Sequence, residues 1–177
     1  MEKLIVYRLE PVLERKQVFA EFQCGFRKGH NTMDNLSNFE RFVSMAVNNK
    51  GIAVALFLDF SKAFDRIWVD GVYSSCLNWG LHGNILNWVR DYLNNRSFQV
   101  RIGDTLSDTY FLDNGVPQGG CLSPLLFNIM MHDFPSLQTD SFKSIFADDC
   151  NLCRSGKNLE SILSVFQHEI EKGFHMG

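Results

Sequence analysis

The sequence predicts an α+β fold in which an antiparallel sheet packs against helices. The first observation is a nearly continuous apolar run, Ile52 to Asp59, which is typical of a central strand covered on both faces. The second is a pair of hairpin patterns, around residues 98–112 and 144–153. The third is a set of apolar stripes at helical spacing between these strands. Strands of both orientations mixed with helices indicate the α+β class.

Two helices and a basic loop are expected before the first strand. Apolar residues recur at helical spacing over residues 4–13, with a kink or a break at Pro11. Residues 23–30, with the sequence QCGFRKGH, predict a basic loop interrupted by glycines. A second apolar stripe over residues 36–47 predicts a helix that Gly51 ends.

The middle of the chain predicts a turn, two helices and a hairpin. Residues 60–67 leave the strand with apolar residues spaced for one helical turn. Helices are expected around residues 70–79 and 83–95, and the second has a well-defined apolar stripe. Alternating residues then predict the hairpin over residues 98–112, with its turn at Gly103-Asp104.

The last third begins with a loop, because residues 115–120 are too rich in Gly and Pro for a regular element. Ser123 is expected to be the N-cap of a helix with Pro124 at its first position, and this helix continues to about Phe134. After the hairpin, an apolar stripe over residues 159–170 predicts a final helix.

Composition limits the classes of protein. The 177 residues fit one domain, and a content of 45% hydrophobic and 13% aromatic residues is ample for a packed core. A net charge of −3 means that any nucleic-acid partner must be held by a local basic face. No secretory signal is visible, and the longest apolar run, Ile52 to Leu58, is far below the ~18–20 residues that span a bilayer. A membrane partner is therefore not expected.

The cysteines indicate an intracellular protein with reduced thiols. They are five in number and irregularly spaced, which does not fit a disulfide framework. Cys150 and Cys153 form a lone CxxC, but on a strand two residues three positions apart point to opposite faces. The pair is therefore expected to be two core thiols and not a metal site.

Three carboxylates carry the main functional signal. Asp59 ends the apolar strand, and Asp148-Asp149 are expected at the tip of the last hairpin. Taken alone, adjacent aspartates in a turn indicate a solvated turn, since Asp is common there. If the strand and the hairpin are neighbours, however, the three carboxylates repel one another and require a cation. Two Mg²⁺ ions at such a site support phosphoryl or nucleotidyl transfer.

The chain resembles the reverse transcriptases of non-LTR (LINE-type, jockey-like) retrotransposons. Three successive core motifs of that family are similar to Phe57–Ile67 (FLDFSKAFDRI), Gly115–Ile129 (GVPQGGCLSPLLFNI) and Phe146–Asp149 (FADD). Residues Gln23–Thr32 (QCGFRKGHNT) look like the fingers motif of that group, and Leu86–Arg96 is also similar to it. The resemblance covers nearly the whole chain, with the motifs in the order of the family.

The resemblance implies a fold and a catalytic site. It implies a polymerase palm, an antiparallel sheet with packed helices, over about residues 51–177, and part of the fingers over about residues 1–50. Asp59, Asp148 and Asp149 match the metal-binding catalytic aspartates, with two Mg²⁺ ions or Mn²⁺ as a substitute, and Asp148 contributes strongly to metal binding in the family.

Four further residues match the positions that contact the incoming nucleotide in the family. Phe64 matches the aromatic ring that excludes a 2′-hydroxyl, and Arg27 matches the arginine that grips the triphosphate. Gln118 and Gly119 match the loop that contacts the nucleotide and the template. Three of them have a structural alternative: Phe64 as a core residue, Arg27 in a solvated loop and Gly119 in an ordinary turn.

The partners implied by the resemblance are an RNA template, a DNA primer and deoxynucleotides, with the nucleus as the expected site of action and the cytoplasm as an alternative. The thumb and an endonuclease domain have no counterpart in the sequence, so the chain is expected to be a fragment of a longer element product with weak or no processive synthesis. Two other functions stay open. One is an inert nucleic-acid-binding remnant, and the other is an RNA-dependent RNA polymerase, which Ala147 and Phe64 disfavour.

Overall fold

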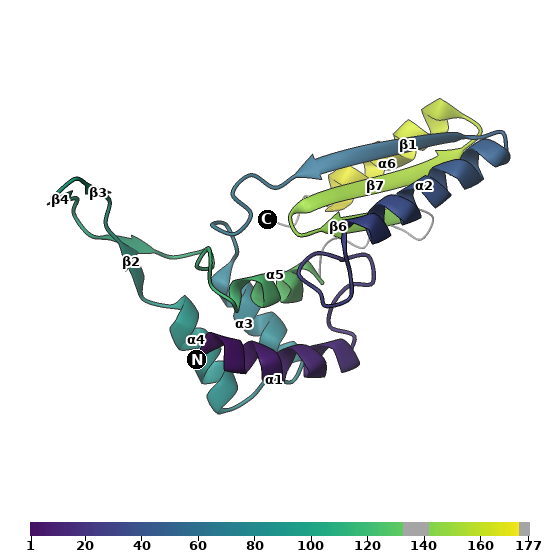
Figure 1. The fold of residues 1–177 in the computed structure, drawn as a ribbon. Helices are drawn as coiled ribbons and strands as arrows, with labels where there is room; N and C mark the ends of the chain where they lie inside the picture. Colours follow the sequence, from purple (N-terminus) through teal and green to yellow (C-terminus); the bar gives the residue numbers. More distant parts are fainter. Residues whose placement is uncertain (133–141, 174–177) are drawn as a thin grey trace. The chain divides into compact units, whose positions relative to one another are not determined.

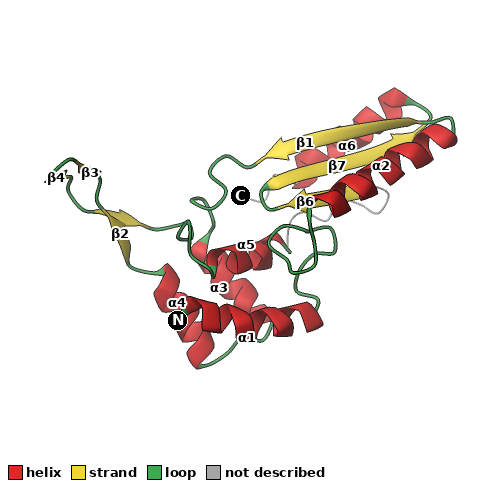
Figure 2. Ribbon diagram, viewed as in Figure 1, coloured by secondary structure: helices red, strands yellow, loops and turns green. Residues whose placement is uncertain are grey.

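The computed structural model describes residues 1–132 and 142–173 of the chain. Its helices, strands and antiparallel pairings confirm the predicted α+β class (Figures 1 and 2). In chain order the elements are α1 (Glu2–Arg15), α2 (Thr32–Asn48), β1 (Ile52–Asp59), α3 (Val69–Asn78), α4 (Asn84–Leu93), β2 (Arg96–Phe98), β3 (Arg101–Ile102), β4 (Thr105–Leu106), β5 (Tyr110–Leu112), α5 (Ser123–Met131), β6 (Phe142–Phe146), β7 (Asp149–Gly156) and α6 (Leu159–Gly173).

The chain forms two compact units, and each is discontinuous in the sequence. The helical unit comprises residues 1–19 and 62–132, and the sheet unit comprises residues 20–61 and 133–177. The predicted boundary between fingers and palm near residue 50 stays a prediction, because these units do not follow it. Each unit is described by itself below.

The sheet unit contains an antiparallel sheet with the strand order β1-β7-β6. Helices α2 and α6 cover opposite faces of this sheet (Figure 1). Phe39 of α2 contacts Phe57 of β1, while Arg154 of β7 bonds Glu169 of α6. Among the described residues β1 pairs only with β7, so it is an edge strand and not the central strand that was predicted. Its apolar run is consequently half-exposed, and the side chain of Phe57 is 68% exposed.

The two strand cysteines lie as predicted on opposite faces of β7. Cys150 and Cys153 are both buried and free, and residues three positions apart on a strand point away from each other. Burial raises the pKa of Cys150 to about 12 and that of Cys153 to about 11. These thiols therefore stay protonated and form part of the core.

The helical unit packs α3 against α4 and α5 around a buried apolar core. Helix α1 continues through Pro11, so the predicted break does not occur there. Glu2 of α1 ties the helices together, because its Oε2 atom accepts from the Leu122 amide (3.1 Å) and from the Tyr92 hydroxyl (3.3 Å). The side chains that form this core include Leu13, Ile67, Val72, Val89, Leu122, Leu126 and Ile129.

The start of α5 differs from the prediction. Its N-cap is Leu122 and not Ser123, and Pro124 is the second helical residue. The Ser123 hydroxyl is taken by the preceding loop, since it donates to the Pro117 carbonyl at 2.6 Å. Glu2 bonds the Leu122 amide in place of a capping side chain. The expected end of this helix, Phe134, lies outside the described residues.

The middle hairpin is present as predicted but is divided into two short ladders. Strand β2 pairs with β5, strand β3 pairs with β4, and Gly103-Asp104 forms the turn. Its apolar side chains are exposed, with Ile102 at 78% and Phe111 at 75%. This hairpin therefore has no core of its own within the described residues.

No helix in residues 1–132 and 142–173 combines the length and the apolar character needed to cross a bilayer.

Candidate active site

Two of the predicted catalytic carboxylates face each other across a strand pair. Asp59, the last residue of β1, is the register partner of Asp149, the first residue of β7. Directly opposed residues in an antiparallel pair point to the same face, with their β-carbons about 4.5–5.5 Å apart. Both residues are exposed. The sheet therefore brings these two carboxylates to one edge, where water and a ligand reach them.

Asp148 lies directly before this pair, in the turn of the β6–β7 hairpin, and is half-buried. The turn residues are Ala147 and Asp148, and Phe146 pairs with Asp149. The prediction that Asp148-Asp149 form the tip is thus wrong by one residue. The left-handed backbone angle falls on Ala147, with φ of 60°, and not on an aspartate. Positive φ at the first turn residue alone is the pattern of a type II′ turn, a position where glycine is usual.

A segment from residues 22–25 holds this turn. The Ile145 amide donates to the Phe22 carbonyl (2.7 Å), and the Cys24 amide donates to the Ile145 carbonyl (2.9 Å). Between them Gln23, 1% exposed, bonds the peptide of Ala147. Gln23 was not predicted as a site residue, although it lies in the motif of residues 23–32, because nothing local links it to Ala147, 124 positions away.

The carboxylates fit Mg²⁺ in their chemistry, since this ion takes oxygen ligands from one or two carboxylates and completes its shell with water and phosphate. Within the residues that the structure describes, no three His, Cys, Asp or Glu side chains are gathered into a ligand group. The structure places Asp59 opposite Asp149, and the metal-binding roles of Asp59, Asp148 and Asp149 stay predictions.

Arg27 has a structural role within its own loop. Its Nη1 atom donates to the carbonyls of Ala20 (3.1 Å) and Gln23 (3.0 Å), and the side chain is half-buried. These bonds fix the backbone that carries Gln23. The predicted contact of Arg27 with a triphosphate stays a prediction.

Phe64 contacts another aromatic ring but is not fully buried. Its ring is half-buried and stacks on Phe127 of α5, with the ring centroids 4.9 Å apart and an angle of 13° between the planes. The Phe64 carbonyl also accepts from the Val116 amide at 2.8 Å. The role of Phe64 as a steric gate stays a prediction.

The loop with Gln118 and Gly119 is hydrogen-bonded to the segment that contains Phe64. Gln118 Nε2 donates to Asp65 Oδ1 at 2.9 Å, and Asp65 follows Phe64 directly in the chain. Gly119 has φ of 86° and is exposed, so its conformation requires glycine while its surroundings are open. Close approach occurs instead at Gly115, where a Cβ would lie 2.7 Å from the Asp65 carbonyl oxygen.

The predicted site residues divide between the two units. Arg27, Asp59, Asp148 and Asp149 belong to the sheet unit. Phe64, Gln118 and Gly119 belong to the helical unit. Within the sheet unit the structure pairs Asp59 with Asp149, while Arg27 bonds its own loop. Within the helical unit Gln118 bonds Asp65, the residue after Phe64.

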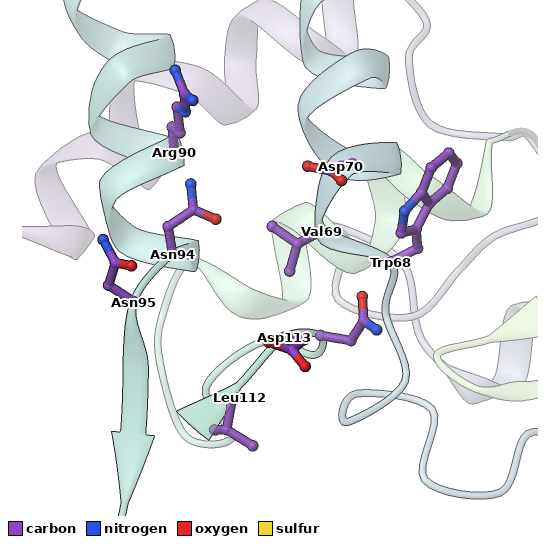
Figure 3. Close-up of a pocket in the computed structure, with 9 residues that line it drawn as sticks. Trp68, Val69, Asp70, Arg90, Asn94, Asn95, Leu112 and Asp113 are labelled. Atoms are coloured by element: carbon purple, nitrogen blue, oxygen red, sulfur yellow. The ribbon is translucent and has the colours of Figure 1, made fainter. Parts of the chain in front are cut away.

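A pocket of about 620 Å³ in the helical unit contains none of the predicted site residues (Figure 3). It mixes acidic, basic and amide side chains, and the Trp68 ring beside it is 63% exposed. Because the charges oppose one another, the lining does not indicate one class of ligand. The lining residues are Trp68, Val69, Asp70, Arg90, Asn94, Asn95, Leu112, Asp113 and Asn114.

Comparison with known families confirms the resemblance found in the sequence. The sequence profile described as reverse transcriptase (RNA-dependent DNA polymerase) matches residues 1–175. The probable RNA-directed DNA polymerase from transposon X-element of Drosophila melanogaster is 35% identical over 152 residues, which cover 84% of this chain and 17% of the relative. The RNA-directed DNA polymerase from mobile element jockey of the same organism is 29% identical over 97% of this chain and 19% of the relative. The chain thus spans less than a fifth of either relative.

Solved structures show the same fold at low sequence identity. Telomerase from Candida albicans, in complex with a TWJ fragment of telomeric RNA, matches 99% of this chain and 32% of its own chain, with a TM-score of 0.67 and 14% identity. Apo telomerase from Candida tropicalis matches 97% of this chain and 33% of its own chain, with a TM-score of 0.63 and 12% identity. Both support an α+β fold in which helices pack on an antiparallel sheet.

Proposed function

We propose that this chain, which belongs to the reverse transcriptase (RNA-dependent DNA polymerase) family, carries the metal-binding centre for RNA-templated DNA synthesis. The reaction is the transfer of a deoxynucleotide to a primer 3′-hydroxyl, with release of pyrophosphate. The observation that carries the proposal is the direct pairing of Asp59 with Asp149 in the β1–β7 ladder. The partners are an RNA template, a DNA primer and deoxynucleotides, and the site of action is the nucleus.

The carboxylates supply negative oxygen ligands at an exposed sheet edge. When bound there, paired divalent ions activate the attacking hydroxyl and stabilise the leaving phosphate. Asp59 and Asp149 would hold such ions from opposite strands, and Asp148 would add its carboxylate from the turn. Because the ladder fixes the backbone on both sides, the two opposed carboxylates are positioned before any ligand arrives.

The nucleotide contacts follow from the family motifs. Arg27 would bind the triphosphate by charge-assisted hydrogen bonds, and Gln118 and Gly119 would contact the base pair through their loop. Phe64 would exclude a 2′-hydroxyl. Its stacking on Phe127 supports this role, because a ring that excludes a hydroxyl group by contact must be held in place. Synthesis by the 177-residue chain alone is expected to be weak, since the chain covers 19% of the jockey polymerase.

Single-nucleotide incorporation tests the proposal. The assay uses a DNA primer on an RNA template, with one deoxynucleotide or one ribonucleotide and Mg²⁺ or Mn²⁺. Removal of a metal ligand forfeits several kcal/mol of transition-state stabilisation, so Asp148→Asn is expected to lower incorporation by on the order of 10³-fold. Asp104→Asn makes the same change at the exposed turn of the middle hairpin and is the matched control.

Mn²⁺ binding, measured by electron paramagnetic resonance, tests the metal centre even if synthesis is too weak to measure. Binding that Asp59→Asn and Asp148→Asn abolish and Asp104→Asn preserves supports the metal centre. Binding that none of these substitutions changes would favour the inert remnant, and preferential ribonucleotide incorporation would favour an RNA polymerase.

A further inference from the structure

We infer that Gln23 is a positioning residue for the catalytic turn, an inference that rests on the proposed function. Its carboxamide is buried against Ala147, directly before Asp148 and Asp149. The Gln23 Oε1 atom accepts from the Ala147 amide (3.1 Å) and from the Gly25 amide (2.7 Å). The Nε2 atom donates to the Ala147 carbonyl at 3.2 Å. One side chain thus bonds both polar groups of the residue that opens the turn.

The chemistry of the amide suits this position. A carboxamide carries both an acceptor and a donor, whereas a carboxylate only accepts and an apolar side chain does neither. Both bonded groups belong to one residue, so together they restrain its orientation in a way that one bond cannot. Because the side chain is buried, water does not replace it readily when it is removed.

The turn needs such restraint because of its backbone. Ala147 has φ of 60°, an unfavourable region for an L-residue with a β-carbon. Conformations of this kind persist where the surrounding structure determines them, and they occur frequently at functional sites. The bonds from Gln23 favour the conformation that presents Asp148 and aligns Asp149 with Asp59.

Gly25 completes the contact. A β-carbon on Gly25 would overlap the backbone nitrogen of Ala147, so only glycine lets the loop approach the turn. The flanking bonds between residues 22–24 and Ile145 place this loop along β6. The segment Gln23-Cys24-Gly25 therefore acts as a brace for the metal-binding turn, which sets its role apart from nucleotide contact.

Mn²⁺ affinity of the full 177-residue chain tests the brace. Replacement of residues that orient metal ligands typically weakens metal binding about 10- to 100-fold, and this loss is expected for Gln23→Met. Gln167→Met makes the same chemical change on the exposed face of α6 and is expected to bind as the wild type does. Ala147→Gly, added to Gln23→Met, is expected to recover affinity because glycine adopts positive φ without the brace.

A second measurement requires no variant. The Ala147 amide hydrogen is expected to exchange slowly with solvent in the wild type, because Gln23 accepts it in a buried position. Rapid exchange of this hydrogen would overturn the positioning role of Gln23. Wild-type Mn²⁺ affinity in Gln23→Met would also overturn it. So would failure of Ala147→Gly to restore the Mn²⁺ affinity of Gln23→Met. If Asp148→Asn abolishes Mn²⁺ binding while Gln23→Met leaves it intact, the inference about Gln23 is wrong and the proposed metal centre stands. If Asp148→Asn has no effect on binding, the proposed metal centre fails.

Discussion

Two antiparallel hairpins within the described residues have similar sequence patterns and very different surroundings. The β6–β7 hairpin is paired with β1, covered on both faces and braced at its turn by Gln23. The middle hairpin, residues 96–112, exposes its apolar side chains, and its turn glycine, Gly103, has open space around it. A hairpin turn is held in one conformation when side chains from other segments bond it, and alternation of residues along the strands does not by itself achieve this.

The ion pairs of the two hairpins should show the largest contrast. Arg154 of β7 bonds Glu169 at 2.8 Å, with side chains only 16% and 7% exposed. Removal of one partner from a buried pair leaves an uncompensated charge, so Arg154→Met is expected to cost about 3–5 kcal/mol in the free energy of unfolding. Urea denaturation measures this loss.

The exposed pair of the middle hairpin is the control for that measurement. Arg101 and Asp104 are 3.8 Å apart and largely solvated, so Asp104→Asn is expected to leave the unfolding midpoint unchanged. The double variant Arg154→Met with Glu169→Met should regain most of the stability, since apolar replacement of a buried pair is often neutral. A double variant as unstable as Arg154→Met would contradict this explanation.

Substitution of a glycine should also cost more stability at the β6–β7 turn than at the turn of the middle hairpin. Gly25→Ala is expected to destabilise the chain by about 3 kcal/mol, because its new methyl group meets the Ala147 backbone, which cannot move away as a flexible side chain would. Gly103→Ala is expected to cost about 1–2 kcal/mol, because only its φ of 61° opposes the substitution. Urea denaturation of both variants measures the difference, and equal losses would show that the turn environments are alike.

Alkaline pH should reveal the smallest contrast, at the buried thiols of β7. The pKa of Cys150 in the fold is raised by burial to about 12, above its ordinary value, so the neutral thiol favours folding. The stability from this thiol is complete below about pH 9 and is lost as the pH rises toward the folded pKa. Between pH 8 and pH 10 the expected loss is about 1.5 kcal/mol for this thiol.

The Cys150→Ala variant isolates this thiol from the other buried cysteines. Its unfolding free energy is expected to fall less steeply with pH than that of the wild type, whatever its stability at pH 8. An unchanged pH slope would refute the burial effect. The middle hairpin contains no cysteine and should contribute nothing to the slope.

Several local features were predictable because they depend on neighbouring residues. The stripe on residues 83–95 predicted α4, the hairpin turn fell at Gly103-Asp104, and the spacing of Cys150 and Cys153 placed them on opposite faces. The core motifs also identified the family, which the profile match over residues 1–175 confirms. Local spacing and motif order are properties of the chain itself, so they are available without a structure.

Two errors in the prediction arose where the structure pairs a group differently from what the local pattern indicates. Ser123 looked like an N-cap, but its hydroxyl donates to the Pro117 carbonyl. The Leu122 amide at the helix start donates to the carboxylate of Glu2. Asp148-Asp149 looked like the turn, but the pairing of Phe146 with Asp149 moves the turn to Ala147 and Asp148. A local pattern gives no information about which partner such a group takes.

The sequence by itself determined which residues could do chemistry: three aspartates within motifs whose order is that of a polymerase family. Only the tertiary structure decided that Asp59 stands opposite Asp149 and that a buried glutamine from another segment bonds the turn between β6 and β7. The physical reason is that register and hydrogen-bond partners depend on which distant strands pair, and this depends on the packing of the whole unit.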